Sequence, residues 1–160
     1  MSLIDNAVYI DGHRKTEPAS VDQTIEALRE CQQDCAHRAE HGEHPNIEGC
    51  FCWIGMLRPD ESEIMEVAEE FGLHTLSVED TVNAHQRPKL EQYGDQLFVV
   101  FRPARYIDET EKVEFGELHV FLGPDFVVTI RHAESPELSA VRSRLEADHE
   151  LLTLGTEAVM

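Results

Sequence analysis

The run CFCWIGML, from Cys50 to Leu57, is apolar on both of the faces that a β-strand would present. Successive side chains of a strand point to opposite sides, so such a run is expected inside a sheet that is covered on both faces. Pro59 ends this strand. A similar run, LFVVF, predicts that the strand from Leu97 to Ile107 lies centrally in the same sheet. The chain is therefore expected to fold with helices on both sides of a sheet.

Helix-forming segments lie between these predicted strands. Ser20, Asp60 and Thr75 each lie where a side-chain oxygen can cap the first turn of a helix. Apolar residues recur at intervals of three and four after Ser20 and after Asp60, which is the spacing of an amphipathic helix. Gly72 suits the left-handed position just past the second helix. The third helix is predicted to be short, from Leu76 to Asn83.

The second half of the chain changes to the strand period. Three strands are predicted, at Leu97–Ile107, Val113–Leu122 and Phe126–Arg131. The turn Gly123-Pro124-Asp125 makes the last two an antiparallel hairpin, and the short link before Val113 makes the first two antiparallel as well. A last helix has Pro136 at its start. The fold class that follows is α/β, a three-layer α/β/α sandwich with a mixed, largely antiparallel sheet.

The charge of the chain limits its partners. It has 160 residues, with 32 acidic and 13 basic side chains and a formal net charge of −19. Such a surface repels phosphate backbones and attracts cations, which argues against nucleic acid and anionic lipid as partners. The sequence has no signal peptide and no apolar run near the roughly 18 residues of a membrane helix. It has no phosphate-binding loop or nucleophile elbow, and His119 and His132 are interpreted as packing or surface residues, so no enzyme activity is expected.

The stretch VEDTVNAHQRPKLE, from Val78 to Glu91, places two acids ahead of a basic cluster. At consecutive helix positions Glu79 and Asp80 diverge by about 100° around the axis, so each would meet a cation with a partner from elsewhere. Magnesium suits such a site, because it keeps most of its waters and takes one or two protein carboxylates. The alternative is a solvated acidic face, with Arg87 and Lys89 placed to neutralise neighbouring acids.

The segment from Cys31 to Cys52 holds all four cysteines and three histidines: Cys31, Cys35, Cys50, Cys52, His37, His41 and His44. Their spacing is similar to that of zinc ligands. On one helix Cys31 and Cys35 share a face that lies about 200° from the histidine pair, so a site that uses both pairs is hard to build. Four cysteines would converge if Cys50 and Cys52 faced this helix. The favoured interpretation is reduced, metal-free thiols that pack as small hydrophobic groups, which makes bound zinc an unexpected outcome.

The segment FGLHTLSVEDTVNAHQRPKLEQYGDQLFVVFR, from Phe71 to Arg102, contains the specific motif HQRPK. It resembles the signature region of the CorA magnesium and cobalt transporters. The segment EFGELHVFLGPDFVVTIRH, from Glu114 to His132, is similar to the next part of the same N-terminal domain, and Phe51 to Leu57 fits its Trp-Ile strand. Thr75 stands where many members have proline. The likeness covers most of Phe51 to Glu157, and the first 48 residues match in the order of elements only.

The resemblance implies that residues 1–150 form a cytosolic α/β/α regulatory domain. It implies that residues 151–160 start the helix that leads toward a stalk and the membrane helices of a homopentamer. The family's Gly-Met-Asn pore motif is absent from this sequence, so this chain alone would not conduct ions. In the family's regulatory site, Asp80 would face an acid on a neighbouring stalk, with Glu79 as a second candidate. Weakly bound Mg²⁺ between the acids would hold the closed state and leave when cytosolic magnesium falls.

The leading interpretation is therefore the cytosolic metal-sensing domain of a CorA-like divalent cation channel in the cell membrane. Its partners would be divalent cations and neighbouring identical subunits. Two alternatives stay open. One is the same architecture in a zinc transporter, since no residue in this sequence selects the transported ion. The other is a stand-alone acidic module that binds zinc or a protein partner.

Overall fold

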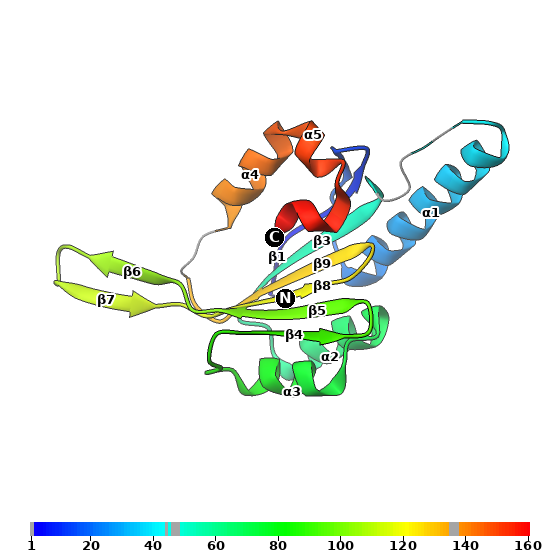
Figure 1. Cartoon of the computed structure of the whole chain (residues 1–160). Helices are drawn as coiled ribbons and strands as arrows, with labels where there is room; N and C mark the ends of the chain where they lie inside the picture. The colour runs from blue at the N-terminus through cyan, green and yellow to red at the C-terminus, as the bar shows by residue number, and fades with distance from the viewer. Residues whose placement is uncertain (1, 44, 46–48, 135–137) are drawn as a thin grey trace.

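The computed structural model describes residues 2–43, 45, 49–134 and 138–160. A seven-stranded sheet has helices on both faces, and a separate two-stranded hairpin projects from one end (Figure 1). This confirms the predicted three-layer α/β/α class. The elements are, in chain order, β1 (Leu3–Ile10), β2 (His13–Thr16), α1 (Val21–Glu40), β3 (Phe51–Leu57), α2 (Glu61–Phe71), α3 (Thr75–Asn83), β4 (Lys89–Tyr93), β5 (Gln96–Phe101), β6 (Ala104–Ile107), β7 (Lys112–Phe115), β8 (Leu118–Leu122), β9 (Phe126–Arg131), α4 (Ser139–Ala147), α5 (His149–Leu152) and the 3-10 helix η2 (Gly155–Val159).

The strand order of the large sheet is β2-β1-β3-β9-β8-β5-β4. β3 and β9 pair in parallel, with Cys52 opposite Phe126. Every other pairing among the described strands is antiparallel, so the sheet is mixed and largely antiparallel, as predicted. β3 and β9 are buried almost throughout. Both faces of the sheet must therefore be covered.

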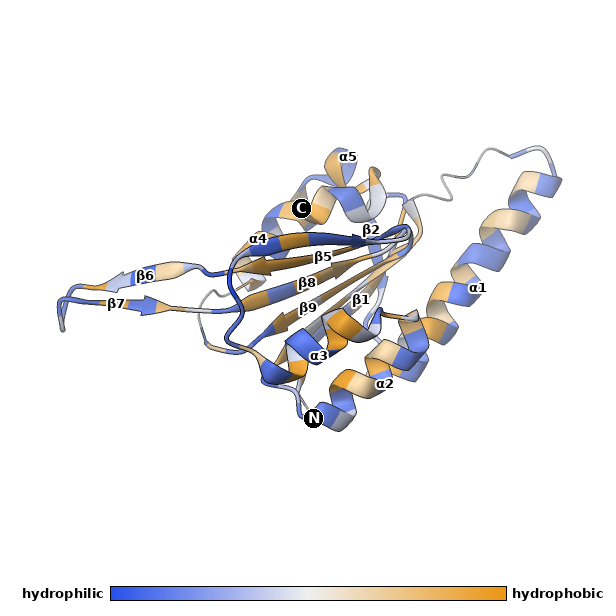
Figure 2. Ribbon diagram, turned by 60° about the horizontal axis from the view of Figure 1, so that its bottom comes forward, coloured by the Kyte–Doolittle hydropathy of each residue, from blue (hydrophilic) through white to orange (hydrophobic). Residues whose placement is uncertain are grey.

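The two faces carry separate hydrophobic clusters. One face packs against α1, α2 and α3, and brings Ile54 of β3 together with Ile25 and Val67. Figure 2 looks onto this side, with α2 and α3 in front of the sheet. The other face packs against α4, α5 and η2, and brings Trp53 together with Leu152. Neighbouring residues of β3 thus serve opposite cores, as the two-sided apolar run predicts.

Two helix starts and one helix end follow their local sequence signals. Ser20 accepts a hydrogen bond from the backbone N–H of Gln23 at the start of α1. Asp60 forms a capping box with Glu63 at the start of α2. Gly72 ends α2 with a φ of 60°, in the left-handed region that a residue with a β-carbon rarely adopts.

The prediction that Thr75 caps α3 was wrong. His74 is the N-cap, and its imidazole Nδ1 accepts the backbone N–H of Leu76 at 3.3 Å. The ring is held for this role by stacking on Tyr93, with the ring centroids 4.1 Å apart. Because Tyr93 belongs to β4, this cap depends on a contact that is distant in sequence.

Two predicted strands are each divided. The predicted strand Leu97–Ile107 separates into β5 and β6 around Pro103, which has no N–H to extend the ladder. The predicted strand Val113–Leu122 separates into β7 and β8 at Gly116, whose N–H donates to the Pro103 carbonyl at 2.7 Å. β6 and β7 consequently pair with each other and project beyond the sheet (Figure 1).

The strand Leu97–Ile107 was predicted to lie at the centre of the sheet, but β5 does not occupy the central position. It is paired on both sides, with β4 and β8, whereas β9 occupies the middle of the order. β4 was not predicted from the sequence. Its residues KLEQY alternate between half-buried and exposed and carry charges of both signs. An edge strand of this kind has too few apolar residues to be distinguished from a loop by pattern alone.

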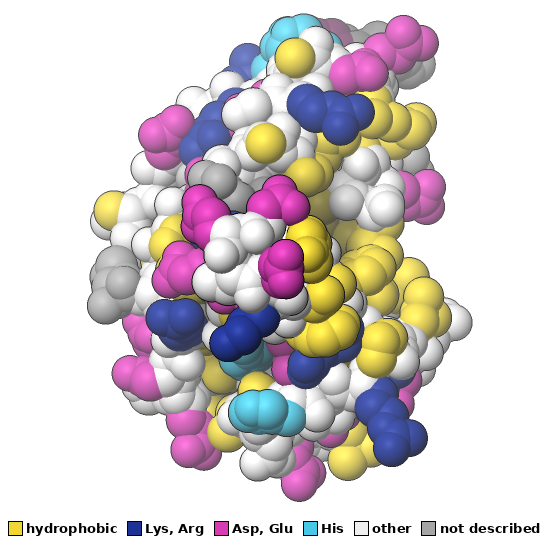
Figure 3. Space-filling view, turned by 90° about the vertical axis from the view of Figure 1, so that its left-hand side faces the viewer, with side chains coloured by type: hydrophobic (Ala, Val, Ile, Leu, Met, Phe, Trp, Pro, Cys, Tyr) yellow, Lys and Arg dark blue, Asp and Glu magenta, His cyan; other side chains and the backbone are white. Residues whose placement is uncertain are grey.

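The β6–β7 hairpin exposes large apolar side chains. Tyr106, Val113 and Phe115 are 58%, 50% and 64% exposed. Figure 3 faces this end of the molecule and shows hydrophobic side chains beside acidic and basic ones. A two-stranded hairpin without a covering layer is only marginally stable by itself, so this segment depends on its connections to β5 and β8.

The C-terminal elements return to the sheet on the face opposite α1. The Thr156 hydroxyl of η2 donates to the Gly123 carbonyl at 2.9 Å. Pro136, predicted at the start of the last helix, lies outside the described residues. Residues 151–160 do not form one continuous helix, because they comprise the end of α5 and then η2. That they lead toward a stalk stays a prediction.

Arg142 connects α4 to the sheet. Its side chain is buried, and its Nε lies 2.9 Å from the Asp5 carboxylate. Both terminal nitrogens donate to the Trp53 carbonyl at 3.3 Å, and the guanidinium lies 4.1 Å from the centroid of the Trp53 ring. Removal of a side chain with so many buried partners leaves several polar groups unpaired.

We expect Arg142→Ala to lower the free energy of unfolding by about 3 kcal/mol, because it removes a buried guanidinium from its half-buried partner Asp5, from the Trp53 carbonyl and from the Trp53 ring. The matched control is Arg105→Ala, which removes the exposed pair of Arg105 and Glu114 in the hairpin and should cost less than about 1 kcal/mol. Urea denaturation of both variants checks this. Equal losses in the two variants would contradict the assignment of Arg142 as the tie between α4 and the sheet.

Candidate functional site

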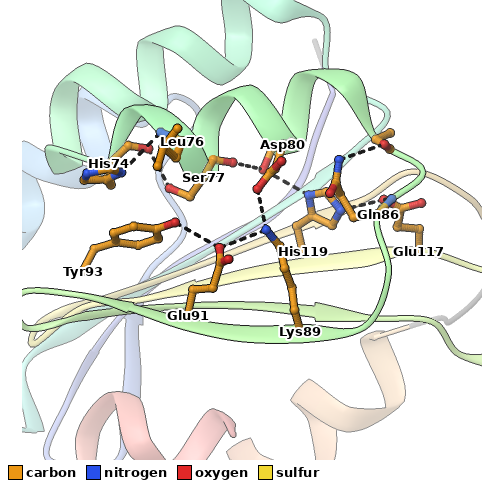
Figure 4. A network of polar contacts seen from close by, with 12 residues as sticks. His74, Leu76, Ser77, Asp80, Gln86, Lys89, Glu91, Tyr93, Glu117 and His119 are labelled. Carbon is orange, nitrogen blue, oxygen red and sulfur yellow. Dashed lines mark hydrogen bonds and ion pairs between the residues drawn. The ribbon is translucent and has the colours of Figure 1, made fainter.

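α3 presents Glu79 and Asp80 to different surroundings. Glu79 is exposed and lines a groove of about 500 Å³ between α2 and α3, which it shares with two further acids, Glu61 and Glu69. Asp80 points toward β4 instead (Figure 4). The structure therefore does not bring the two predicted metal residues together, in keeping with their offset of about 100° on the helix.

Lys89 bridges Asp80 to Glu91. Its Nζ lies 2.5 Å from the Asp80 carboxylate and 2.9 Å from that of Glu91, and the Tyr93 hydroxyl donates to Glu91 at 3.0 Å (Figure 4). Partial burial lowers the pKa of Lys89, but its hydrogen bonds with the two carboxylates outweigh burial and raise that pKa overall. The Lys89 hydrogen bond also lowers the pKa of Glu91. The cluster is thus one ammonium between two carboxylates.

β4 positions this cluster by its alternation. Lys89, Glu91 and Tyr93 are the half-buried members of the strand, and side chains two residues apart share a face. The prediction that Lys89 neutralises a neighbouring acid is confirmed. The side chains of Lys89 and Asp80 are 25% and 28% exposed. The Asp80 side chain is therefore partly open to solvent.

A buried polar layer lies beneath α3. His119 of β8 has its Nδ1 3.0 Å from the Thr81 hydroxyl and its Nε2 2.8 Å from the Glu117 carboxylate. Because a carboxylate only accepts, Nε2 carries the proton of the neutral ring. Glu117 also accepts the Gln86 backbone N–H at 3.0 Å and pairs with Arg102 at 2.6 Å. These contacts fix the loop after α3 against β8.

Burial determines the direction of the pKa shift for the two histidines of this layer, but not for Glu117. It lowers the pKa of His119 to about 4, an effect that Glu117 opposes and His132 reinforces. It lowers the pKa of His132 as well. Burial alone would raise the pKa of Glu117, but the Gln86 N–H, His119 and Arg102 hold it below its ordinary value. His119 is therefore neutral and Glu117 ionised at pH 7.

His119 was interpreted from the sequence as a packing or surface residue of a strand, and it is fully buried. Its partnership with Glu117 was not predicted. The two residues are two positions apart, and this spacing brings their side chains to one face of an extended chain. This spacing of two residues was the sequence signal from which the Glu117–His119 pair could have been predicted. The position of Thr81 over the same imidazole was not readable, because it depends on how α3 crosses the sheet.

Three of the four cysteines converge where α1 meets the start of β3. The sulfur atoms of Cys31, Cys35 and Cys50 all lie within 4.8 Å of one another, and those of Cys35 and Cys50 are 3.1 Å apart. Burial raises the pKa of the Cys31 and Cys50 thiols. Cys52 lies elsewhere, in the large core beneath α1, α2 and α3. The four-cysteine arrangement is not formed, and a three-cysteine arrangement replaces it.

Two histidines of the same segment lie apart from the thiols. His37 and His41 are exposed near the end of α1, with their ring centroids 4.3 Å apart. His44 lies outside the described residues. The predicted separation of the cysteine pair from the histidine pair on α1 is confirmed.

Comparison with known proteins identifies the family. Residues 48–157 match the family described as CorA-like Mg²⁺ transporter protein. The chain belongs to the CorA family. In the described part of the chain, no helix combines the length and apolar character needed to cross a membrane. Membership of a transporter family argues against an enzymatic role for this domain.

Two relatives illustrate the extent of the likeness. YfjQ of Bacillus subtilis is 33% identical over 116 residues, which are 72% of this chain and 34% of that protein. The cobalt/magnesium transport protein CorA of Thermotoga maritima is 26% identical over 101 residues, which are 62% of this chain and 29% of that protein. The chain therefore spans about a third of the length of these relatives.

Solved structures share the fold. The full-length CmaX protein superposes with a TM-score of 0.64 at 16% identity, over 98% of this chain and 42% of its own. The soluble domain of CorA from Methanocaldococcus jannaschii gives a TM-score of 0.56 at 10% identity, over 92% of this chain and 48% of its own. The fold likeness thus reaches the N-terminal residues that lie outside the family match.

We expect the stability of the chain to fall between pH 7 and pH 5. A histidine of the unfolded chain protonates near its ordinary pKa, whereas folded His119 stays neutral until about pH 4, so protons favour the unfolded state. His119 should contribute about 2 kcal/mol of this loss. Urea denaturation at several pH values should show a shallower fall for His119→Gln than for wild type. The exposed-histidine control His37→Gln should follow wild type, and a His119→Gln curve parallel to wild type would contradict the assignment.

Proposed function

We propose that this chain is the metal-sensing regulatory domain of a CorA-like divalent cation channel for Mg²⁺ and Co²⁺. In the proposal it lies on the cytoplasmic side of the cell membrane and assembles with identical subunits as a homopentamer. The observation that carries the proposal is Asp80, a solvent-accessible acid held by one ammonium at 2.5 Å. Membership of the CorA family supports cation transport as the context. The net charge of −19 favours cations near the domain.

Lys89 occupies the position that a regulatory cation would take. A hydrated magnesium ion needs only one or two protein carboxylates, so partial exposure of Asp80 is sufficient for binding. Binding at Asp80 exchanges one counter-ion for another. The displaced ammonium keeps a partner, because Glu91 already holds it at 2.9 Å. The exchange is therefore less costly than leaving a partly buried lysine without an anion.

An acid from a neighbouring subunit would complete the site. Two facing carboxylates repel one another without an ion, and a divalent cation between them favours the arrangement in which they are close. Loss of Mg²⁺ then shifts the equilibrium toward the open state, because the ion binds one state better than the other. Glu79, which faces the groove between α2 and α3, is the second candidate ligand.

A zinc transporter of the same architecture is the second candidate function. The convergence of Cys31, Cys35 and Cys50 favours it, because thiolates prefer Zn²⁺ to Mg²⁺. Ion flux through the full-length protein, measured separately with Mg²⁺, Co²⁺ and Zn²⁺, distinguishes the two functions.

In the full-length protein, substitutions at Asp80 and Lys89 should shift the magnesium response in opposite directions. Asp80→Ala should remove most of the protection that Mg²⁺ gives against limited proteolysis, because the ion loses its ligand. Asp80→Lys should protect without Mg²⁺, because the new ammonium pairs with the opposing acid. Lys89→Met should lower the protective Mg²⁺ concentration several-fold, because Asp80 loses its competing counter-ion.

The matched control is Glu69→Ala, which removes a groove acid on α2 and should leave the magnesium titration unchanged. Glu79→Ala tests the second candidate in the same assay. If both Asp80 variants respond to Mg²⁺ as wild type does, Asp80 is a solvated acid and the regulatory proposal fails.

The isolated 160-residue chain should bind Mg²⁺ weakly, with a dissociation constant of about 1 mM or more, because the Asp80 carboxylate is already paired with Lys89 and no acid from a neighbouring subunit is present. Isothermal titration calorimetry measures this. Asp80→Ala should change the free energy of unfolding by less than about 1 kcal/mol, as is usual for a partly exposed ion pair. Tight binding of Mg²⁺ that survives Asp80→Ala would place the site elsewhere.

A further inference from the structure

Cys31, Cys35 and Cys50 bring three sulfur atoms together from separate parts of the chain. α1 supplies Cys31 and Cys35 one turn apart, and Cys50 comes directly before β3. Around a zinc ion with Zn–S bonds of about 2.3 Å, tetrahedrally arranged sulfur atoms lie about 3.8 Å apart. The Cys35–Cys50 separation is 3.1 Å and all three atoms lie within 4.8 Å of one another. Shifts of about 1 Å or less therefore convert the cluster into a ligand set.

We propose that Cys31, Cys35 and Cys50 bind a thiophilic divalent metal ion of the zinc class through three thiolates, with a fourth position open to solvent or another ligand. Three protein ligands and one open position are a common zinc coordination. The site lies between α1 and β3, whereas Asp80 lies on α3. The zinc proposal therefore does not depend on the proposed regulatory role of Asp80.

The three cysteines are set apart from the main cores. They form a small cluster of their own, with Ile10 packed against it. Cys52 provides the comparison, because it is equally buried but lies among the aliphatic and aromatic residues of the large core. A cysteine that only fills space needs no second sulfur beside it. Three thiols grouped together, with the fourth excluded, match the requirement of a metal ion instead.

The charge of three thiolates and the polarisability of their sulfur atoms both favour Zn²⁺. Each thiol releases its proton to solvent when the metal binds. Three thiolates with Zn²⁺ leave one net negative charge, which is far less costly to bury than three. Thiolate sulfur selects Zn²⁺ over Mg²⁺. The cysteine cluster would therefore bind Zn²⁺, and the Asp80 carboxylate would bind Mg²⁺. The bound ion would fasten α1 to the start of β3.

The test is a metal titration of the reduced 160-residue chain after removal of metal with a chelator. Zn²⁺ should bind in competition with a chromogenic chelator at one equivalent per chain, and Co²⁺ should give the charge-transfer absorption of thiolate ligation. Cys35→Ala should weaken Zn²⁺ binding by more than the roughly 100-fold that loss of a supporting group costs. Cys52→Ala, the matched buried cysteine, should keep the wild-type affinity.

X-ray absorption of the wild-type zinc complex tests the proposal without any variant. Three sulfur neighbours at about 2.3 Å are expected. His37→Ala/His41→Ala removes the exposed imidazole pair and should leave binding intact. The proposal is overturned if the neighbours are only nitrogen or oxygen, if Cys52→Ala loses binding as Cys35→Ala does, or if reduced wild-type chain takes up no tightly bound equivalent.

Discussion

The parallel pairing of β3 with β9 is the constraint on which the rest of the molecule depends. Both strands are buried almost throughout, so each face of the sheet requires its own layer of helices. α1, α2 and α3 supply one layer, and α4, α5 and η2 supply the other. Arg142 attaches α4 to the sheet by donating to the Trp53 carbonyl of β3. The position of Asp80 over β4 follows from this layering. The candidate site is therefore a product of how α3 covers the sheet, and not of a loop added to it.

Two of the few bases of this acidic chain neutralise acids that are partly buried near α3. Arg102 meets Glu117 in the buried layer under α3, and Lys89 meets Asp80 and Glu91 at its edge. The excess of acids is left mostly to exposed positions, where repulsion is screened by solvent and salt. Partly buried acids thus carry their own counter-ions, and an external cation that binds at one of them must compete with a base of the same chain.

Features that depend on neighbouring residues could be predicted from the sequence. Features that depend on contacts between distant parts of the chain could not. The two-sided run CFCWIGML and the caps at Ser20 and Asp60 were readable because each depends on neighbouring residues alone. The division of two predicted strands, at Pro103 and at Gly116, was not readable, because it requires the chain to leave one sheet and return to it. The cysteine cluster shows the same limit. Since Cys50 precedes β3 instead of lying within it, the alternation that would have placed Cys50 and Cys52 on one face does not apply.

The pairing of Cys52 with Phe126 also determines when the domain can form during synthesis. The middle of the sheet cannot close until β9 has left the ribosome, by which time α1, α2, α3 and the β6–β7 hairpin have already been made. Contacts this distant in sequence slow folding, because the intervening chain must be ordered first. Until then one apolar edge of β3 stays unpaired, and an unpaired strand edge of this kind is prone to aggregation.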